Sequence, residues 1–268
     1  AAVITNAPTG CAAVMSTAER FIFALGASSN PRLVKWCDQE SDTNWTPSAT
    51  SQAGDFELQT VGALKAGKKV RGINLLFTDV DVHTATYVGL PYVYSFEKAA
   101  SGCGLISAQA VAAIDTAALW MSTSGFWTFD GYVKPLPCDV SDYVFQNMNY
   151  NQVSKVYAVH NSKYGEVWWF YPSNASNEVD SYVSFNYREN HWNIGSLART
   201  AGVDRGVYLQ PLMVSADGYI YEHEVGYDYD SGVLYAESGP LEIGQGDNIM
   251  SVRQVIPDEQ TLGEVVVS

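Results

Sequence analysis

The sequence predicts an all-β protein, a β-propeller-like array of about five four-stranded antiparallel blades. Three observations predict it: apolar segments of one pattern recur along the 268 residues, turn signals flank them, and no window of a dozen residues keeps an uninterrupted helical spacing of apolar positions. Antiparallel units of about 40 to 50 residues repeated along a chain are typical of propellers.

The recurring segments are "RFIFALG", "NLLFTD", "ALWMSTSG", "VWWFYPS" and "YIYEHEVG". When Phe21, Leu75, Leu119, Val167 and Tyr219 are matched, the spacings are 54, 44, 48 and 52 residues. A second series follows the first after short turns: "RLVKW", "TATYV", "GFWTF", "SYVSF" and "GVLY". We expect the two series to be neighbouring strands of each blade.

Further strands complete each unit. Hairpins ahead of the first series are predicted from "AAVMSTAERFIFAL", "VAAIDTAALWMS", "VYAVHNSKYGEVWWFY" and "LMVSADGYIYEHE", in which two apolar runs flank a polar turn. A fourth strand is predicted from segments such as "PYVYSF" and "HWNIGSL". The Ala-rich "SAQAVAAIDTAALWM" is interpreted as strands because it aligns with the other hairpins.

The repeats predict a single propeller domain over residues 1–268. The expected blades are 10–54, 55–102, 103–150, 151–205 and 206–247. Residues 248–268 either close the ring by pairing with "VITN" or begin a further blade, so five or six blades are expected. The missing Met and the end "GEVVVS" favour a processed chain or a fragment of a longer one, although a trimmed chain would look the same.

The stretch "EVWWFYPSN" contains four consecutive aromatic residues. Alternation along a strand sends Trp168 and Phe170 to one face, and Val167, Trp169 and Tyr171 to the other. Because a blade would pack on each face, we expect both tryptophans to be largely buried.

Composition narrows the function classes. The chain has 29 Asp and Glu against 15 Lys and Arg, for a net charge of -14, so specific capture of nucleic acid is not expected. No apolar run approaches the roughly 18 to 20 residues of a spanning helix, and no secretory leader is evident, so no membrane insertion is predicted. Cys11, Cys37, Cys103 and Cys138 lack CxxC spacing and are predicted to be reduced, with one disulfide left open.

No cofactor or catalytic residue is predicted. The acidic segment "YEHEVGYDYDSG" contains Glu222, His223 and Glu224, and its Asp228 and Asp230 imitate the start of a calcium loop. The loop pattern breaks afterwards, so these two are weak metal candidates and a solvated hairpin tip is favoured. "TDVDVH", with Asp79, Asp81 and His83, is likewise interpreted as a solvated hairpin tip and not as a metal site.

An enzyme or a sugar-binding protein is the alternative. "SADGYIY" and "STSGFW" match parts of the Asp box of sialidase-like propellers, SxDxGxTW, but neither carries the whole box, and two positioned carboxylates would also be needed. The four histidines are scattered over three of the units and no GxSxG motif occurs, so no catalytic base is expected. Tyr227, Tyr229 and Trp45, near turns, are the aromatic residues expected to be exposed to a sugar.

Several phrases resemble one known family. "ERFIFALG", "NPRLVKWCDQESDTNW", "RGINLLFTD", "FEKAASGCGLIS", "FWTFDGYVKPLPCDV" and "NYRENHWNIGSLARTAG" are similar to the tail hub or nozzle proteins of short-tailed bacteriophages (podoviruses), also described as packaged-DNA stabilisation proteins. The resemblance covers roughly Cys11 to Gly202 and is weak over the last 60 or so residues. Full-length members are considerably longer, which leaves a channel-gating role for this chain open.

The resemblance implies a non-enzymatic structural protein of the virion tail, made in the host cytoplasm. It implies a propeller assembled as a homo-oligomeric ring, of six copies, beneath the portal and its adaptor, with tail fibres or spikes attached. Such a ring continues the DNA channel, retains packaged DNA and guides its ejection, so that DNA is a passing, non-specific occupant. Part of the -14 charge would then either face the channel and repel phosphates or form a soluble outer surface.

Overall fold

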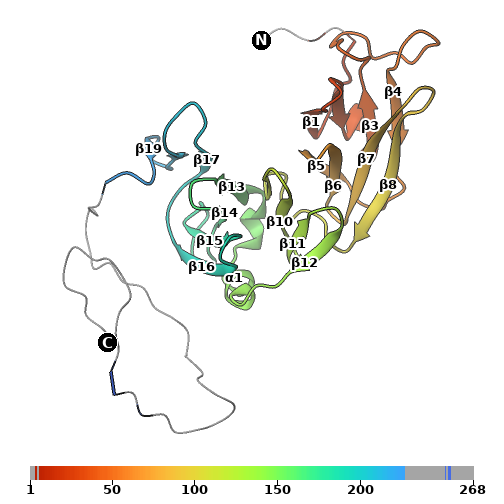
Figure 1. Cartoon of the computed structure of the whole chain (residues 1–268). Coiled ribbons are helices and arrows are strands. Elements are labelled where there is room, and N and C mark those ends of the chain that lie inside the picture. Colours follow the sequence, from red (N-terminus) through yellow and green to blue (C-terminus); the bar gives the residue numbers. More distant parts are fainter. Residues whose placement is uncertain (1–3, 5, 227–250, 252, 255–268) are drawn as a thin grey trace. The chain divides into compact units, whose positions relative to one another are not determined.

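The computed structural model describes residue 4, residues 6–226 and residues 251, 253 and 254. Contacts divide the chain into a unit of Ala1–Val225, which contains every helix and strand described, and a second unit of Gly226–Ser268. In the first unit, five antiparallel sheets follow one another along the sequence (Figure 1). The predicted fold class, an all-β propeller-like array of antiparallel units, is confirmed.

The first two sheets are four-stranded meanders in which every strand pairs with its neighbour in sequence. The strands are β1 (Ala13–Ser16), β2 (Ile22–Leu25), β3 (Leu33–Trp36) and β4 (Gly54–Glu57) in the first sheet, and β5 (Leu64–Val70), β6 (Ile73–Thr78), β7 (Asp81–Gly89) and β8 (Val93–Ser101) in the second. A short 3-10 turn, η1 (Ala27–Ser29), links β2 to β3.

The third and fourth sheets repeat this pattern, and the fifth has three strands within the described residues. Their strands are β9 (Val111–Ala113), β10 (Ala118–Ser122), β11 (Gly125–Phe129) and β12 (Val133–Leu136); β13 (Tyr157–Asn161), β14 (Glu166–Tyr171), β15 (Ser181–Asn186) and β16 (His191–Ser196); and β17 (Ala201–Val203), β18 (Leu212–Val214) and β19 (Ile220–Glu222). Between the third and fourth sheets lie the helix α1 (Ser141–Gln146) and the 3-10 segment η2 (Tyr150–Lys155). Helix is therefore scarce among the described residues, and the Ala-rich segment forms strands, as predicted.

The hydrophobic core lies in layers between consecutive sheets. Leu25 packs with Leu76 between the first and second sheets, whereas Phe77, the next residue of β6, belongs to the layer shared with the third sheet. There the rings of Phe77 and Trp120 meet at 5.2 Å between centroids. A further layer, which includes Met213, joins the fourth and fifth sheets. Middle strands are apolar on both faces because each face meets another sheet.

The first strands of consecutive sheets lie next to one another. β1 contacts β5, β5 contacts β9, β9 contacts β13 and β13 contacts β17. Gln109, just before β9, forms a parallel bridge with Tyr157 at the start of β13. Gly67 lets β5 approach the first sheet closely, since a Cβ there would lie 2.3 Å from Met15 Sδ and would displace that side chain. Pockets with walls from more than one sheet are therefore expected along these first strands.

The aromatic stretch lies in β14, the second strand of the fourth sheet. Val167, Trp169 and Tyr171 pack in the layer toward the third sheet, and Phe170 packs in the layer toward the fifth, so the predicted alternation is confirmed. Trp169 is fully buried. Trp168 is only half-buried, which corrects the expectation for this residue: it faces the fifth sheet, whose three-residue strands cover less of it.

The fifth repeat is shifted by one strand from its prediction. The sequence matched Tyr219 to the second strands of the other units, but β18 takes the second position and the Tyr219 segment forms the third strand, β19. β17 begins at Ala201, before the predicted limit at residue 206. Hairpin signals alone cannot distinguish a first-to-second pairing from a second-to-third pairing. Burial does so here, because Met213 of β18 is buried while β19 is exposed.

Two further expectations concern Trp45 and the C-terminal segments. Trp45 was expected to be exposed, which is wrong: it is 3% exposed, its Nε1 donates to Asp42 O at 2.6 Å, and it packs beside Cys37. The local turn provides the polar partner that the indole needs for burial. The predicted "GVLY" strand and the closing segment 248–268 lie outside the described residues, apart from residues 251, 253 and 254.

Candidate functional site

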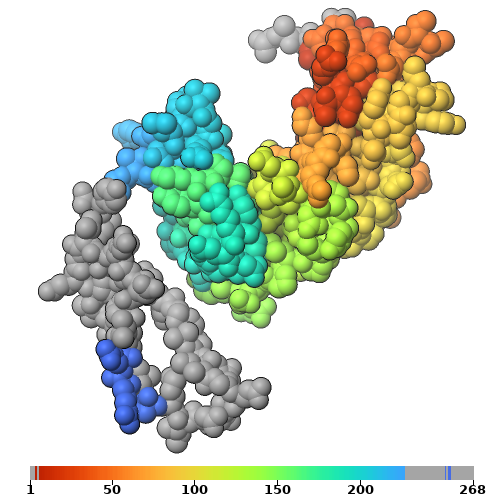
Figure 2. Space-filling view, viewed as in Figure 1, coloured from red at the N-terminus to blue at the C-terminus, as the bar shows by residue number. Residues whose placement is uncertain are grey.

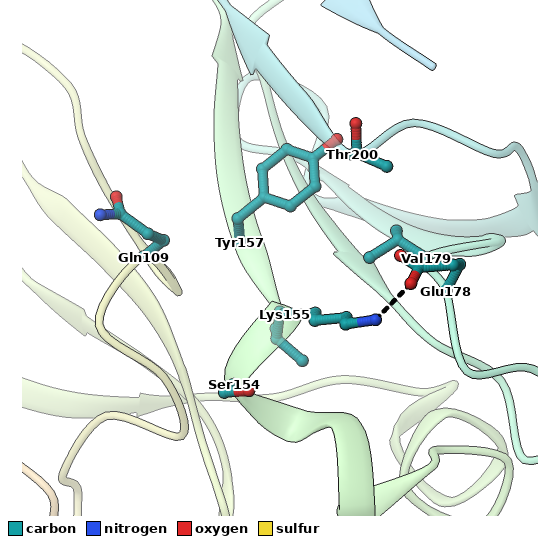
Figure 3. Close-up of a pocket in the computed structure, with 8 residues that line it drawn as sticks. Gln109, Ser154, Lys155, Tyr157, Glu178, Val179 and Thr200 are labelled. Atoms are coloured by element: carbon teal, nitrogen blue, oxygen red, sulfur yellow. Dashed lines mark hydrogen bonds and ion pairs between the residues drawn. The ribbon is translucent and has the colours of Figure 1, made fainter. Parts of the chain in front are cut away.

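A pocket of about 330 Å³ lies at the start of β13, with walls from the third, fourth and fifth sheets (Figure 3). Its lining mixes polar and apolar residues: Gln109, Ser154, Lys155, Val156, Tyr157, Glu178, Val179 and Thr200. The backbone here is held by cross-sheet hydrogen bonds. The Ser107 hydroxyl donates to Val156 O, and Ala158 N donates to Gln109 O at 2.8 Å. These bonds tie the segment before β9 to the start of β13 at one side of the pocket.

Several polar side chains of this pocket already have defined partners. Lys155 Nζ forms an ion pair with Glu178 and donates to Asn177 O at 2.7 Å. The Tyr157 hydroxyl donates to Arg199 O at 2.9 Å, and burial raises the pKa of Tyr157, so this phenol is a hydrogen-bonding group and not a base. Such an arrangement suits the binding of a small polar molecule through hydrogen bonds.

A second pocket, of about 230 Å³, shares Gln109 with the first. It is lined by residues of β1, of β5 and of the segment before β9: Ala12, Ala13, Val14, Lys65, Ala66, Gly67, Lys68, Ala108 and Gln109. The two lysines are its only charged lining residues. Apart from Gln109, its other lining residues have small side chains.

β5 places these lysines. The pairing of β5 with β6 shifts between Leu64 and Ala66, so Lys65 is the extra residue of a β-bulge. Ala66 and Lys68 share one face of the strand by alternation. Both lysines are half-buried, and neither forms an ion pair or a side-chain hydrogen bond with any residue that the structure describes. Burial lowers the pKa of Lys68.

A buried ionic network occupies the start of β7. Asp81 and His83, expected at a solvated hairpin tip, are 1% and 3% exposed, so that expectation is wrong. Asp81 accepts hydrogen bonds from Thr78 Oγ1 at 2.6 Å and from Thr60 Oγ1 at 2.8 Å, and it pairs with Lys98 Nζ at 2.9 Å. These partners, from three segments, satisfy the carboxylate and allow its burial.

The same network shifts the pKa values of Asp81 and His83. Burial alone would raise the pKa of Asp81, but hydrogen bonds from Thr78, Lys98 and Thr60 outweigh it and lower the pKa. Burial lowers the pKa of His83, against the attraction of Asp81. His83 Nε2 lies 3.2 Å from Asp81 Oδ1. Thr60 lies before β5, the first strand of the second sheet, and Lys98 lies on β8, its last strand. The network therefore connects the segment that precedes this sheet to the sheet itself.

A third polar cluster lies at the far end of β13. His160 Nδ1 is 3.3 Å from Asp204 Oδ2, and His160 Nε2 is 3.0 Å from the Tyr187 hydroxyl. Burial lowers the pKa of His160, against the attraction of Asp204. Arg205 Nε donates to Ser162 Oγ at 3.2 Å beside it. Sequence reasoning missed this cluster because its members come from distant segments and belong to no motif.

The predicted metal candidates Asp228 and Asp230, and the aromatic residues Tyr227 and Tyr229, lie outside the described residues. Of their neighbours, Glu222 is exposed and His223 Nε2 accepts a hydrogen bond from Arg199 Nε at 3.0 Å. Within the part of the chain that the structure describes, no group of three or more His, Cys, Asp or Glu is arranged to hold a metal ion.

All four cysteines are free, as predicted. Cys37 and Cys103 are buried, and Cys11 and Cys138 are half-buried. None of the helices among the described residues is long and apolar enough to cross a membrane.

No family model matches the sequence, and no curated protein matches it. Similar solved structures include the AfRom2 CNH domain, with 12% identity over 78% of this chain and 70% of that chain and a TM-score of 0.43. They also include BamB from Moraxella catarrhalis, with 12% identity, 79% and 57% coverage and a TM-score of 0.43, and the N-terminal domain of Nup159, with 9% identity, 79% and 60% coverage and a TM-score of 0.47. This chain spans less than two thirds of the length of the latter two.

Proposed function

We propose that the chain is a structural protein of a short-tailed phage tail, a hub or nozzle component that assembles as a homo-oligomeric ring. Support comes from the order and density of the family-like phrases, which lie largely in the four complete sheets. In this role the sheets act as a rigid scaffold, and the functional parts are surfaces that meet other subunits, the portal or adaptor, and fibres or spikes. DNA passes through the ring without sequence-specific contacts.

One observation favours assembly in particular. The fifth sheet carries exposed apolar side chains: Val203 is 57% exposed, Tyr219 69% and Ile220 68%. Residues 201–222 appear in the blue part of the space-filling view (Figure 2). Apolar side chains that gather at one surface mark protein contact sites more often than isolated ones do. A subunit of a ring would bury such side chains against its neighbour.

The proposal assigns no catalytic residue and no cofactor, and it places the chain in the virion tail after synthesis in the host cytoplasm. Native mass spectrometry of the purified protein, together with electron microscopy of the particle, tests it. A closed ring, six copies in the expected case, located below the portal supports it. A strictly monomeric protein that is absent from purified virions contradicts it, as does release of reducing sugar from host glycans by the pure chain.

A carbohydrate-binding adhesin is the second candidate, favoured by the pocket at the start of β13. The amide, hydroxyl, ammonium and carboxylate groups around Tyr157 are of the kinds that form hydrogen bonds with the hydroxyls of a sugar ring. Glu178→Ala should then weaken binding of host polysaccharide, whereas Glu57→Ala, which removes a comparably exposed ion-paired carboxylate of β4, should leave it unchanged. Saturable polysaccharide binding with this pattern would favour an adhesin over the ring.

A further inference from the structure

The first strands of the five sheets have an unusual charge distribution for this chain. The net charge of the chain is -14, but β1, β5, β9, β13 and β17 contain no Asp or Glu. β5 alone, with the sequence LKAGKKV, carries three lysines. Positive charge is therefore concentrated on one strand beside a pocket, in a protein whose surface is otherwise acidic.

The two lysines at the pocket have no side-chain partner among the residues that the structure describes. Other lysines of the chain, such as Lys98, Lys134 and Lys155, form ion pairs with carboxylates. Lys65 and Lys68 form none among the described residues, although both are half-buried. A partly desolvated ammonium group without a counter-charge is unfavourable, and burial accordingly lowers the pKa of Lys68. An anion in the pocket would relieve that cost.

A third donor lies at the same place. Gln109 lines the pocket, and its side-chain amide makes no hydrogen bond with any described residue, while its backbone is fixed by the bridge to Tyr157. Two lysines and one glutamine thus line a space of about 230 Å³ whose other lining residues are mostly small. Lysine ammonium groups bind phosphate as point charges, without a fixed fork geometry.

We propose that Lys65, Lys68 and Gln109 form a binding site for a phosphate group at the first strands of the first three sheets. The charge of a phosphate group near neutral pH, about -1.5 to -2 for a monoester, matches two ammonium groups. The group can belong to free phosphate or a small phosphomonoester, or to the backbone of a nucleic acid. The proposal stands whether or not the chain is a tail protein.

Calorimetric titration of the full chain with inorganic phosphate, at constant ionic strength, tests the site. Saturable binding to one site is expected, and Lys68→Gln should weaken it about 10-fold, as for loss of one charged hydrogen bond. Gln109→Ala should weaken it without changing the charge of the protein. The matched control is Lys69→Gln, which removes the same charge from the exposed neighbouring position on β5, outside the pocket lining.

Phosphate that fails to saturate, or that loses as much affinity with Lys69→Gln as with Lys68→Gln, overturns the proposal. Thermal unfolding of each variant verifies that it folds. Lys65→Gln, at the β-bulge, is a second substitution of a pocket lysine and should also weaken phosphate binding. A short oligothymidylate distinguishes the sources of the phosphate group. Competition between the oligonucleotide and phosphate, with both weakened by Lys68→Gln, identifies a site that accepts a nucleic-acid backbone. Oligonucleotide binding that neither phosphate nor Lys68→Gln affects restricts the site to free anions.

Discussion

Trp168 and Trp169 are neighbours on β14 that should differ widely in their contribution to stability. Trp169 is fully buried between the third and fourth sheets, 5.0 Å from Phe126 between ring centroids, and its Nε1 donates to Ala110 O at 3.0 Å. Trp168 is half-buried, stacks on Tyr182 at 4.5 Å and donates to Glu166. The same substitution on the two faces of one strand therefore tests the layered architecture directly.

The magnitudes follow from burial. A fully buried tryptophan removes about 200 Å² of surface from water, worth up to about 5 kcal/mol at about 25 cal/mol per Å². Measured Trp→Ala losses in cores are about 3 to 5 kcal/mol. The carbonyl of Ala110 loses the indole N–H but keeps the backbone N–H of Met121 as a donor at 3.1 Å, so no unsatisfied acceptor is added. We expect Trp169→Ala to lower the free energy of unfolding by about 5 kcal/mol. Trp168→Ala, with partial burial and no closed cavity, should lower it by about 1 to 2 kcal/mol.

Urea unfolding followed by far-ultraviolet circular dichroism measures both losses, provided that the slope with urea is unchanged. For a unit of about 225 residues, about 5 kcal/mol corresponds to about 10 to 20 °C in Tm. Should Trp169→Ala fail to fold, Trp169→Phe keeps most of the ring and should lose about 2 kcal/mol. Equal losses at the two positions, or a larger loss for Trp168→Ala, would refute the assignment of Trp169 to an inter-sheet layer.

Three further outcomes are expected. Gly104→Ala should cost about 3 kcal/mol, since its Cβ would lie 2.2 Å from backbone atoms, whereas Gly206→Ala, with no atom within 4 Å, should change urea stability by less than about 0.5 kcal/mol. The folded-state pKa of His83 is lowered by burial, so its contribution to stability is present above its unfolded pKa near 6.5 and is lost as pH falls. His83→Gln should therefore flatten the decline of the urea midpoint below pH 6.5. Burial raises the pKa of Cys103 to about 11, so iodoacetamide at pH 8 should leave this cysteine unmodified by mass spectrometry until urea unfolds the chain.

The fold class could be predicted because one physical constraint repeats. A strand covered on both faces must be apolar on both faces, and the segments at Phe77, Trp120 and Trp169 satisfy this in three successive sheets. The frame of the fifth repeat could not be predicted in the same way. Its strands are only three residues long, and the exposed Tyr219 segment has the same composition as a buried strand.

Burial of single polar and aromatic groups was harder to predict, because it depends on partners that lie far along the chain. Asp81 is buried since Thr60 and Lys98 reach it, and nothing near Asp81 in the sequence indicates either contact. Trp45 has a local polar partner, the carbonyl of Asp42, but its ring packs with Ala24 and Cys37 from other segments. The motif-like acidic segments were interpreted from local spacing, and local spacing contains no information on such partners.

The proposed phosphate site shows why a negative net charge does not exclude local binding of an anion. A charge of -14 spread over the whole chain repels phosphate at long range, but at physiological ionic strength this repulsion is screened beyond about 8 Å. A bound phosphate group would instead respond to the nearest charges, Lys65 and Lys68, which no described carboxylate neutralises. The acidic balance therefore argues against tight, extended binding of nucleic acid over the surface. It does not argue against one phosphate held in a pocket whose own lining is basic.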